Sequence, residues 1–309
     1  MGKGRNAVLA GLVVGAAAGV ARRRRAAEWA RERARRFQTT GRTVTVTTGD
    51  GVRIAAEIDD HPAPQVAVVF SHGWLMSRHC WRFQRDALAG RAMLVCYDQR
   101  GHGESSAAPL DAYTIGNLGD DLAAVIEATV PDGLPVVLVG HSMGGMTIMA
   151  LAERHPELIA SRVAGVALLS TSAGRLARST FGLPGPLGRL AARVTPRVFE
   201  SMLVRAEEID GRPRLKELTN LPVTRYVAFG KGARLADVRF VNAMAAATAT
   251  EPMVAFFRQF QVHDRLSALK ALQGMETLII AGERDRLTPP SHSRRIAKAL
   301  PGARLIITP

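Results

Sequence analysis

The sequence predicts a single α/β domain, with a mostly parallel, doubly wound sheet that is preceded by an antiparallel hairpin and interrupted by a helical insertion. Three observations support this class. Short apolar runs alternate with longer amphipathic stretches from residue 66 onward, which is the pattern of βαβ units around a buried parallel sheet. Two β-branched segments joined by a Gly-Asp-Gly turn come before that pattern. The alternation stops at about residue 172 and resumes at about residue 263.

The elements follow from these patterns in order. The hairpin is predicted at residues 43–47 and 52–58, with Gly49 to Gly51 as its turn. Later strands are predicted at residues 66–70, 93–97, 135–139, 163–169, 277–281 and 304–307, and helices at residues 80–88, 115–128, 143–154 and 291–299. We expect helices on both faces of the sheet, an α/β core at residues 43–171 and 263–309, and a helical lid at residues 172–262. A chain of 309 residues with 47% hydrophobic composition can bury such a core.

Charge is unevenly distributed along the chain. The formal net charge is +14, and residues 1–42 hold eleven basic side chains against Glu28 and Glu32. The rest of the chain has no basic stripe of the kind that follows a phosphate backbone, so we expect no nucleic-acid binding. The two cysteines, Cys80 and Cys96, have neither metal-site nor redox-pair spacing and are expected to be free thiols.

Residues 1–42 form a basic N-terminal arm with a short apolar segment. The run of apolar and small residues at 7–21 would span about 22 Å as a helix, less than the ~30 Å hydrocarbon core of a bilayer. Three glycines at four-residue spacing in this run would let two such helices approach closely. Residues 7–36 therefore either bind a membrane surface, with the folded domain on the cytoplasmic side, or form a disordered cytoplasmic tail. The four arginines after the run argue against a cleaved signal peptide.

The segment Gly140-His141-Ser142-Met143-Gly144 carries the strongest chemical signal. It follows a predicted strand and precedes a predicted helix, so Ser142 occupies a tight strand-to-helix turn that exposes its hydroxyl above the sheet. The flanking glycines are needed because such a turn crowds any Cβ. Ser142 is therefore a candidate nucleophile, whereas the bare G-x-S-x-G pattern would also fit a turn without chemistry.

A second loop is expected at the same edge of the sheet. His72-Gly73-Trp74 follows the predicted strand at residues 66–70, where a backbone N–H could point at the same space as that of Met143. Two such donors form an oxyanion hole, which stabilises the negative oxygen of a tetrahedral intermediate. We expect Trp74 and Met143 to supply these donors and His72 to shape the loop.

A candidate carboxylate follows the predicted strand at residues 277–281. Asp285 ends the segment Gly-Glu-Arg-Asp, and a residue just past a parallel strand lies at the same sheet edge as Ser142. Its role would be to orient a histidine in the tautomer that accepts the serine proton. Glu283 and Asp264 compete for this role, but the loop before Pro289 is expected to turn Asp285 toward the sheet edge.

Together these motifs resemble those of the α/β-hydrolase superfamily over residues 43–309. The stretch from Tyr97 to Ser105, Tyr-Asp-Gln-Arg-Gly-His-Gly-Glu-Ser, is similar to the loop after the fourth strand of that family. The resemblance implies a Ser, an Asp and a His in that chain order, a helical lid and no cofactor. It further implies hydrolysis of esters or related acyl bonds through an acyl-serine.

The resemblance also implies a histidine in a loop just past the final strand, and this sequence stops there, at Pro309. A serine hydroxyl is a poor nucleophile without an adjacent base. We therefore expect the chain to be truncated and nearly inert as a hydrolase, and a longer form with a histidine shortly after Pro309 to be active.

No histidine of the chain is an expected substitute for the missing base. Three are expected to be structural or at the surface: His61, His155 and His263. His79 lies at the start of a helix, and the side chain of His141 should point away from Ser142. His102 is expected to organise its loop, with substrate contact as the alternative. His292 is nearest to Asp285 in sequence, but the preceding prolines place it in the first turn of a helix.

The leading expectation is a serine hydrolase that acts on a small ester or acyl substrate. Apolar residues of the insertion suit a lid over an acyl pocket, although they equally suit packing of the lid on the body: Phe181, Leu187, Phe199, Met202, Phe240, Met244, Phe256 and Phe257. The alternatives are other chemistry on the same fold, such as a carbon-carbon hydrolase, a lyase or a cofactor-free haloperoxidase, and a non-catalytic binding protein. Relatives with an aspartate nucleophile are disfavoured because the turn carries Ser142.

Overall fold

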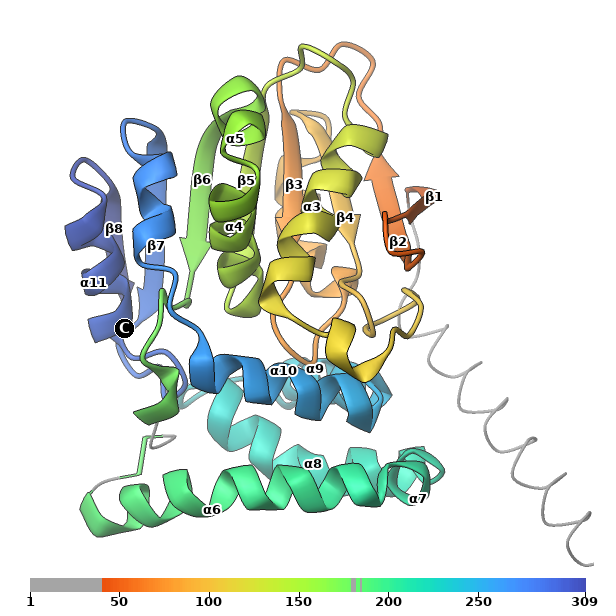
Figure 1. Cartoon of the computed structure of the whole chain (residues 1–309), viewed down its shortest axis with the longest axis vertical. Coiled ribbons are helices and arrows are strands. Elements are labelled where there is room, and N and C mark those ends of the chain that lie inside the picture. Colours follow the sequence, from red (N-terminus) through yellow and green to blue (C-terminus); the bar gives the residue numbers. More distant parts are fainter. Residues whose placement is uncertain (1–40, 179–181, 184) are drawn as a thin grey trace, which may run out of the picture.

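The computed structural model describes residues 41–178, 182–183 and 185–309. In this part of the chain eight strands form one sheet in the order β1-β2-β4-β3-β5-β6-β7-β8, as Figure 1 shows. The strands are β1 (Arg42–Thr47), β2 (Arg53–Asp59), β3 (Ala67–Ser71), β4 (Met93–Tyr97), β5 (Val136–His141), β6 (Val163–Leu169), β7 (Glu276–Gly282) and β8 (Arg304–Thr308). β1 and β2 pair antiparallel, β2 pairs antiparallel with β4, and the remaining pairs are parallel. The predicted fold class is confirmed.

One face of the sheet is covered by α3 (Ile115–Thr129), α4 (Met143–Arg154), α5 (Pro156–Arg162) and α11 (Pro290–Ala299). The main core lies there, where side chains such as Leu122, Ile148 and Ile296 pack against Val69 and Leu138. The sequence pattern did not indicate α5. It begins with Pro156 directly after α4 has ended, and proline at the first turn of a helix is well tolerated.

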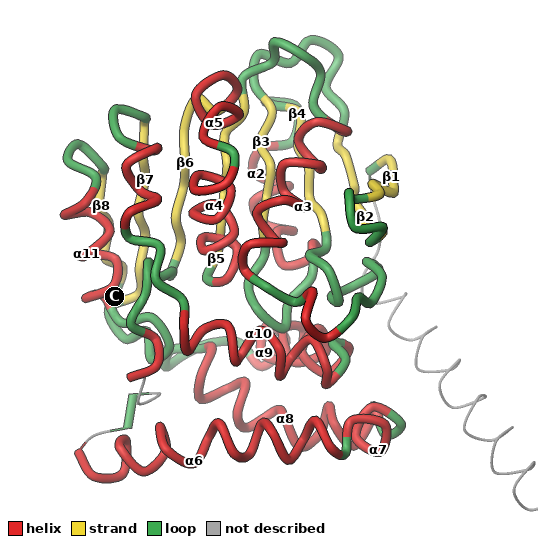
Figure 2. The backbone as a smooth tube through the Cα atoms, viewed as in Figure 1, coloured by secondary structure: helices red, strands yellow, loops and turns green. Residues whose placement is uncertain are grey.

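The opposite face is covered less completely than expected. Within the described residues it packs against η1 (Arg78–Trp81) and α2 (Arg82–Leu88), which lie behind the sheet in Figure 2. Trp81 and the free thiol Cys96 belong to this smaller core. Further along the sheet, Val137, Val139 and Leu169 on this face are half-buried. Helices therefore lie on both faces, but unequally.

Between β6 and β7 the chain leaves the sheet for a run of helices. These are η3 (Leu176–Arg178), α6 (Gly185–Val204), α7 (Ala206–Asp210), α8 (Pro213–Ala228), α9 (Leu235–Ala247), α10 (Thr250–Val262) and η4 (Ser267–Leu272). Figure 1 shows α9 and α10 directly beneath the lower ends of the strands and α6 farther out. We call α6 to α10 the helical cap. It stands over the carboxyl ends of β3, β5 and β6, where the candidate site lies.

The N-terminal arm is almost wholly outside the described residues, and so is the segment at residues 7–36 for which membrane binding is expected. Within the described ranges, no helix combines the length and the apolar character needed to cross a bilayer.

Candidate functional site

Ser142 lies between the end of β5 and the start of α4. Its backbone angles are φ 51° and ψ −114°, a combination that costs a non-glycine residue about 1–3 kcal/mol. The Ser142 N–H donates to the carbonyl of Leu169 at 2.9 Å, and the Ser142 carbonyl accepts from Thr171 Oγ1 at 2.6 Å. Contacts from the end of β6 and the loop after it therefore hold the strained turn in place.

The glycines around Ser142 are required by close packing of the backbone. A Cβ on Gly144 would lie 2.0 Å from the carbonyl oxygen of Ser71, and one on Gly140 would lie 2.6 Å from the carbonyl carbon of Gly144. Both distances are shorter than any real contact of a Cβ, and the obstacle is backbone in each case. The expectation that this turn crowds any Cβ is therefore correct, and the crowding comes from the neighbouring strand as well as from the turn itself.

Ser142 lines a cavity of about 60 Å³ between the sheet edge and the helical cap. The other walls come from Trp74, from Met146 of α4, from Ala192 and Thr195 of α6, and from Phe257 and Phe260 of α10. The space is small beside the ~300–1,000 Å³ of typical ligand pockets. The serine hydroxyl thus stands in a narrow, mostly apolar chamber.

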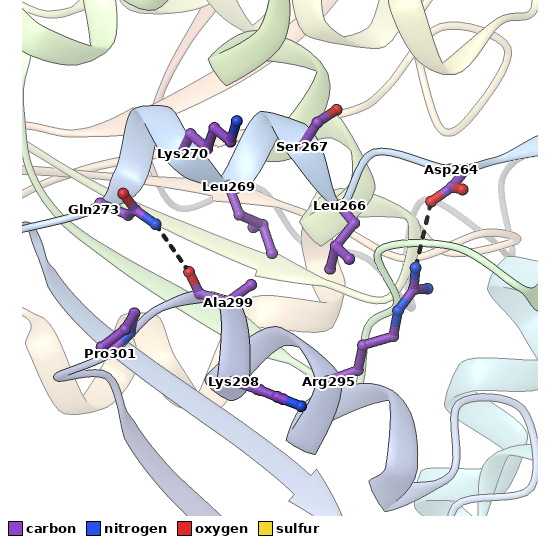
Figure 3. A pocket seen from close by; sticks show the side chains of 10 residues that line it. All are labelled: Asp264, Leu266, Ser267, Leu269, Lys270, Gln273, Arg295, Lys298, Ala299 and Pro301. Carbon is purple, nitrogen blue, oxygen red and sulfur yellow. Dashed lines mark hydrogen bonds and ion pairs between the residues drawn. The ribbon is translucent and has the colours of Figure 1, made fainter.

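A larger groove of about 600 Å³ lies between η4 and α11, away from Ser142. Figure 3 shows its floor formed by Leu266 and Leu269, with Arg295 turned toward Asp264 at one end. Apart from the competing carboxylate Asp264, it is lined by none of the candidate site residues, counting the described part of the chain. Its size therefore does not make it the reactive site.

Trp74 connects the loop after β3 to the helical cap. Its indole Nε1 donates to the carbonyl oxygen of Met253 at 3.2 Å. Its ring meets that of Phe260 edge-on at a centroid distance of 5.4 Å and that of Phe257 at 6.2 Å. Met143, the second expected donor, is buried as the first residue of α4, so its N–H is one of those without an acceptor inside the helix. Trp74 lines the Ser142 cavity, whereas Met143, the next residue after Ser142, is not among its lining residues.

His72 is fully buried and holds the β3 loop to the β4 loop. Its Nε2 accepts from the backbone N–H of Gln99 at 2.9 Å, and its Nδ1 lies 2.8 Å from the carbonyl oxygen of Gly73. Because one ring nitrogen accepts and the other faces a carbonyl, the neutral tautomer with the proton on Nδ1 fits. Burial lowers the pKa of His72 to about 4. These are the contacts of a residue that shapes a loop.

His102 also has structural contacts. Its Nε2 accepts from Leu75 N at 3.3 Å and its Nδ1 lies 3.0 Å from the Arg100 carbonyl. Burial lowers its pKa to about 3. Since the ring is 1% exposed and lies outside the lining of the Ser142 cavity, the arrangement favours loop organisation over substrate contact.

His141 packs beneath Gly73, where an added Cβ would lie 2.6 Å from the His141 Nδ1. Gly73 is therefore needed for the close approach of the β3 loop to the end of β5. Burial lowers the pKa of His141. The ring is directed toward the Gly73 loop, in keeping with the expectation that it does not serve the Ser142 hydroxyl.

Asp285 lies in the loop after β7, held by its own chain. Its Oδ1 accepts from the N–H groups of Leu287 and Thr288 at 2.9 Å each, and its Oδ2 accepts from Thr288 Oγ1 at 3.0 Å. Thr288 lines the Ser142 cavity, so the loop reaches the site. Oδ2 keeps a lone pair with which it could accept one more hydrogen bond. The competitor Glu283 is exposed, and the competitor Asp264 lies 3.7 Å from Arg295 instead.

The remaining histidines are engaged elsewhere. His292 Nδ1 pairs with Ser172 Oγ at 2.7 Å, and His263 Nε2 pairs with the Ser172 carbonyl at 2.9 Å. His155 pairs with Asp120 at 2.8 Å, and His61 lies near Gly90 O at 3.2 Å. Among the hydrogen bonds of the described residues, none joins a histidine to Ser142 or Asp285. In the described part of the chain, the loop that carries Asp285 thus reaches the Ser142 cavity through Leu287 and Thr288, and no histidine hydrogen-bonds to either residue.

Two buried side chains near the site, Gln99 and Arg78, were not indicated by any sequence pattern. Gln99 is fully buried and bridges the β3 loop to α4. Arg78 is also buried and pairs with Glu57, Asp98 and Glu104. Both residues belong to or contact the loop after β4. The motif from Tyr97 to Ser105 located that loop, but it did not indicate which contacts its side chains make.

The apolar residues of the insertion divide into two groups. Phe257 lines the Ser142 cavity, and Phe199 stacks on Phe257 at a centroid distance of 4.1 Å. Phe256 packs against Tyr113 instead, and Phe240 packs under Arg82. Leu187 was a candidate both for lining the pocket and for packing the lid on the body, but it is 58% exposed on the outer side of α6 and does neither. Phe181 is outside the described residues.

Within the described part of the chain there is no cluster of three or more potential metal ligands among His, Cys, Asp and Glu.

Comparison with known proteins places this geometry in context. A protein-family model described as "alpha/beta hydrolase fold" matches residues 66–309. A bifunctional esterase/perhydrolase of Acinetobacter calcoaceticus is 26% identical over 272 residues, covering 85% of this chain and 90% of that protein. The structure resembles an esterase from Exiguobacterium antarcticum with a TM-score of 0.67 and 20% identity, covering 87% of this chain and 91% of that one. A hydrolase from Pseudomonas aeruginosa matches with a TM-score of 0.62 and 26% identity over 88% and 91%.

Proposed function

The chain belongs to the α/β-hydrolase family, and on this basis we propose that it is a serine hydrolase that cleaves a carboxylic ester or a related acyl bond through an acyl-Ser142 intermediate. The observation that carries the proposal is the strained backbone of Ser142, with φ 51°, at the wall of a mostly apolar chamber. Backbone strain of this kind persists where the surrounding structure enforces it, and it is concentrated at active sites. Three other non-glycine residues of the described chain, Leu75, Ser170 and Arg175, also have positive φ, so the strain supports the proposal together with the position of Ser142 on the chamber wall.

The reaction begins with attack of Ser142 Oγ on the acyl carbonyl carbon. The carbonyl oxygen then becomes negative, and the N–H groups of Met143 and Trp74 stabilise it. The Met143 N–H lies at the positive end of α4 and is free of an intrahelical acceptor, which suits an oxyanion. Loss of one such donor typically costs about 2.7–4 kcal/mol of transition-state stabilisation. The alcohol departs, and water releases the acid from Ser142.

The base that takes the Ser142 proton is not supplied by a histidine that contacts Ser142 or Asp285 in the described structure. Asp285 is the group that would orient an imidazole there, through the remaining lone pair of Oδ2. A general base contributes about 10²–10⁴-fold to such a step. Turnover at Ser142 therefore requires a base that reaches its hydroxyl, and Asp285 is the carboxylate that would orient that base.

The helical cap acts as the lid of the site and sets the size of the acyl group. Its α6 and α10 close the chamber above Ser142, leaving about 60 Å³. Typical ligand pockets measure about 300–1,000 Å³. The chamber as it stands suits a short acyl group such as acetyl, and a longer chain requires the cap to move.

The test is covalent labelling of Ser142 by a fluorophosphonate, read by peptide mass spectrometry, with and without added imidazole. We expect labelling at Ser142 alone, faster with imidazole, and none in Ser142→Ala. Ser161→Ala changes an exposed serine on α5 and should label like the parent chain. No labelling of the parent chain at Ser142 under any condition would contradict the proposal and favour a binding protein.

A further inference from the structure

Helix α6 forms the outer layer of the helical cap, on the far side of α10 from the sheet, as Figure 1 shows. Its inner side is fully engaged. Phe199 stacks on Phe257 of α10, Glu200 pairs with Arg258, and Ala192 and Thr195 line the Ser142 cavity. The outer side has no such partners, and its composition is unusual for a surface helix.

Four large apolar side chains stand on that outer side. Leu187, Leu190, Val194 and Val198 are 58%, 57%, 42% and 46% exposed. Their spacing of three, four and four residues places them on one side of a helix, in a row of about three turns. Single exposed apolar residues are ordinary in soluble proteins, but a continuous row of them indicates an interaction surface.

A column of arginines runs beside this row. Arg189, Arg193 and Arg197 are exposed and follow one another at four-residue spacing. No ion pair or hydrogen bond of theirs occurs within the described residues. The one acidic residue of α6, Glu200, is already paired with Arg258. The outer side of α6 therefore combines apolar side chains with three positive charges and no negative charge.

The rest of the cap has the same character. Residues 172–262 hold fourteen Lys or Arg against seven Asp or Glu. Helix α8 also exposes large apolar side chains, among them Leu215 at 51% and Leu218 at 70%. The surplus of positive charge thus extends beyond α6 over the cap.

We propose that the outer side of α6 binds the surface of an anionic phospholipid membrane. A helix with an apolar row and an adjoining arginine column lies in the plane of such a surface, with its apolar side chains among the acyl chains and its arginines at the headgroups. Charge complementarity selects this partner. A second copy of the chain would bring the three arginines of one α6 close to those of the other, which like-charge repulsion opposes.

This surface is separate from the chemistry of Ser142, because binding requires only the outer side of α6. It does have a consequence for the site. The inner side of the same helix lines the cavity, so a membrane-bound chain holds Ser142 one helix away from the lipid. A substrate dissolved in the membrane would then reach the site by displacement of α6.

The experiment is sedimentation of the full chain with phosphatidylcholine vesicles and with vesicles that also contain phosphatidylglycerol. We expect salt-sensitive binding to the anionic vesicles only. The variants are Leu190→Ser with Val194→Ser, and Arg189→Ser with Arg193→Ser and Arg197→Ser. Each set should lower the partition coefficient at least about tenfold. The arginine set removes three charges that each contribute about 1 kcal/mol at an anionic surface, and the other set removes buried apolar area from the bound state.

Two controls separate α6 from other surfaces. Leu110→Ser with Val262→Ser removes two exposed apolar residues elsewhere, which are 40% and 75% exposed, and should bind like the parent chain. All sets are repeated in a full chain with Arg22 to Arg25 changed to serine, which removes four of the eleven basic side chains of the N-terminal arm and weakens its contribution. Thermal unfolding midpoints should match throughout because the changed residues are exposed.

Three outcomes would overturn the proposal. The parent chain could fail to bind anionic vesicles, or the α6 variants could bind as well as the parent chain in both backgrounds. The apolar variants could also convert a dimer to a monomer in light scattering while vesicle binding stays unchanged, which would assign the surface to a second copy of the chain.

Discussion

Thr147 Oγ1 lies 2.7 Å from Gln99 Oε1 and donates a hydrogen bond to it. The other end of the same amide, Gln99 Nε2, donates to the carbonyl oxygen of His72. One buried side chain thus connects the loop that carries Trp74 with the helix that begins directly after Ser142. The separation of the two proposed oxyanion donors depends on this bridge.

Replacing Gln99 by leucine should weaken both the fold and the site. The side chain keeps a similar volume, but the buried His72 carbonyl loses its partner, at about 1–3 kcal/mol, while the Thr147 hydroxyl keeps only its bond to the Met143 carbonyl. We expect a lower free energy of unfolding in urea and slower fluorophosphonate labelling of Ser142. Gln99→Glu keeps the acceptor for Thr147 and loses the donor to His72. It should slow labelling as well, and unchanged labelling in both variants would show that the bridge does not position the site.

Gly144→Ala should be strongly destabilising. The new Cβ would lie 2.0 Å from the Ser71 carbonyl oxygen, and because that atom belongs to a central strand, β3 and α4 must separate. We expect a loss at the upper end of the range for overpacking a core, about 3 kcal/mol in unfolding free energy, because the obstacle is backbone. The matched control is Gly282→Ala, where no atom lies within 4 Å of the added Cβ. Equal stability of the two variants would contradict the packing described around Ser142.

Imidazole should accelerate the ester hydrolysis of the 309-residue chain. Within the described residues no histidine hydrogen-bonds to Ser142 or Asp285, and Asp285 Oδ2 can accept a hydrogen bond from an added imidazole. With p-nitrophenyl acetate we expect a saturable increase of at least about tenfold, within the range for general bases. Ser142→Ala measures the reaction of imidazole with the ester in solution. Asp285→Asn should reduce the increase while Glu283→Gln should not, and an increase as large in Ser142→Ala as in the parent chain would exclude the serine.

Phe257→Leu should shift the preference toward longer acyl groups. Phe257 lines the chamber, so a smaller side chain lengthens it. One methylene in an apolar pocket is worth about 1–3 kcal/mol, which is at least about tenfold in relative rate. We expect the ratio of butanoate to acetate hydrolysis, measured with imidazole, to rise accordingly. Phe256→Leu is the control, because Phe256 is equally buried but packs against Tyr113. Equal ratios in both variants would mean that the chamber does not hold the acyl group.

Acid should destabilise the fold before most carboxylates are protonated. Burial lowers the pKa of His72 and His263 to about 4 and that of His102 to about 3. The unfolded chain binds these protons near pH 6.5 whereas the native chain does not, so stability is complete above pH 6.5 and falls as the pH decreases toward 4. We expect the unfolding free energy to decrease over that range. His102→Gln should reduce the slope by one proton.

Local patterns in the sequence were enough to predict most of the scaffold and the central residue of the site. The helix at Met143–Arg154 and the strands at Met93–Tyr97 and Val163–Leu169 have the predicted bounds, because apolar periodicity reports burial directly. Ser142 could be found because its turn needs glycines at set positions within five residues. Each of these signals comes from neighbours along the chain.

Tertiary structure decided what lies around Ser142 and which way the helical cap faces. Gln99 bonds to His72, which is 27 positions away in the sequence, and to Thr147, which is 48 positions away. No local sequence pattern indicates contacts over such separations. Leu187 is as apolar as a pocket residue but faces outward. The contact of Phe199 with Phe257 of α10 decides which side of α6 is turned inward. The sequence by itself determined the strands and the turn at Ser142, because local backbone geometry restricts them. The contacts of the histidines, the size of the chamber and the exposed side of α6 followed only from packing between distant segments.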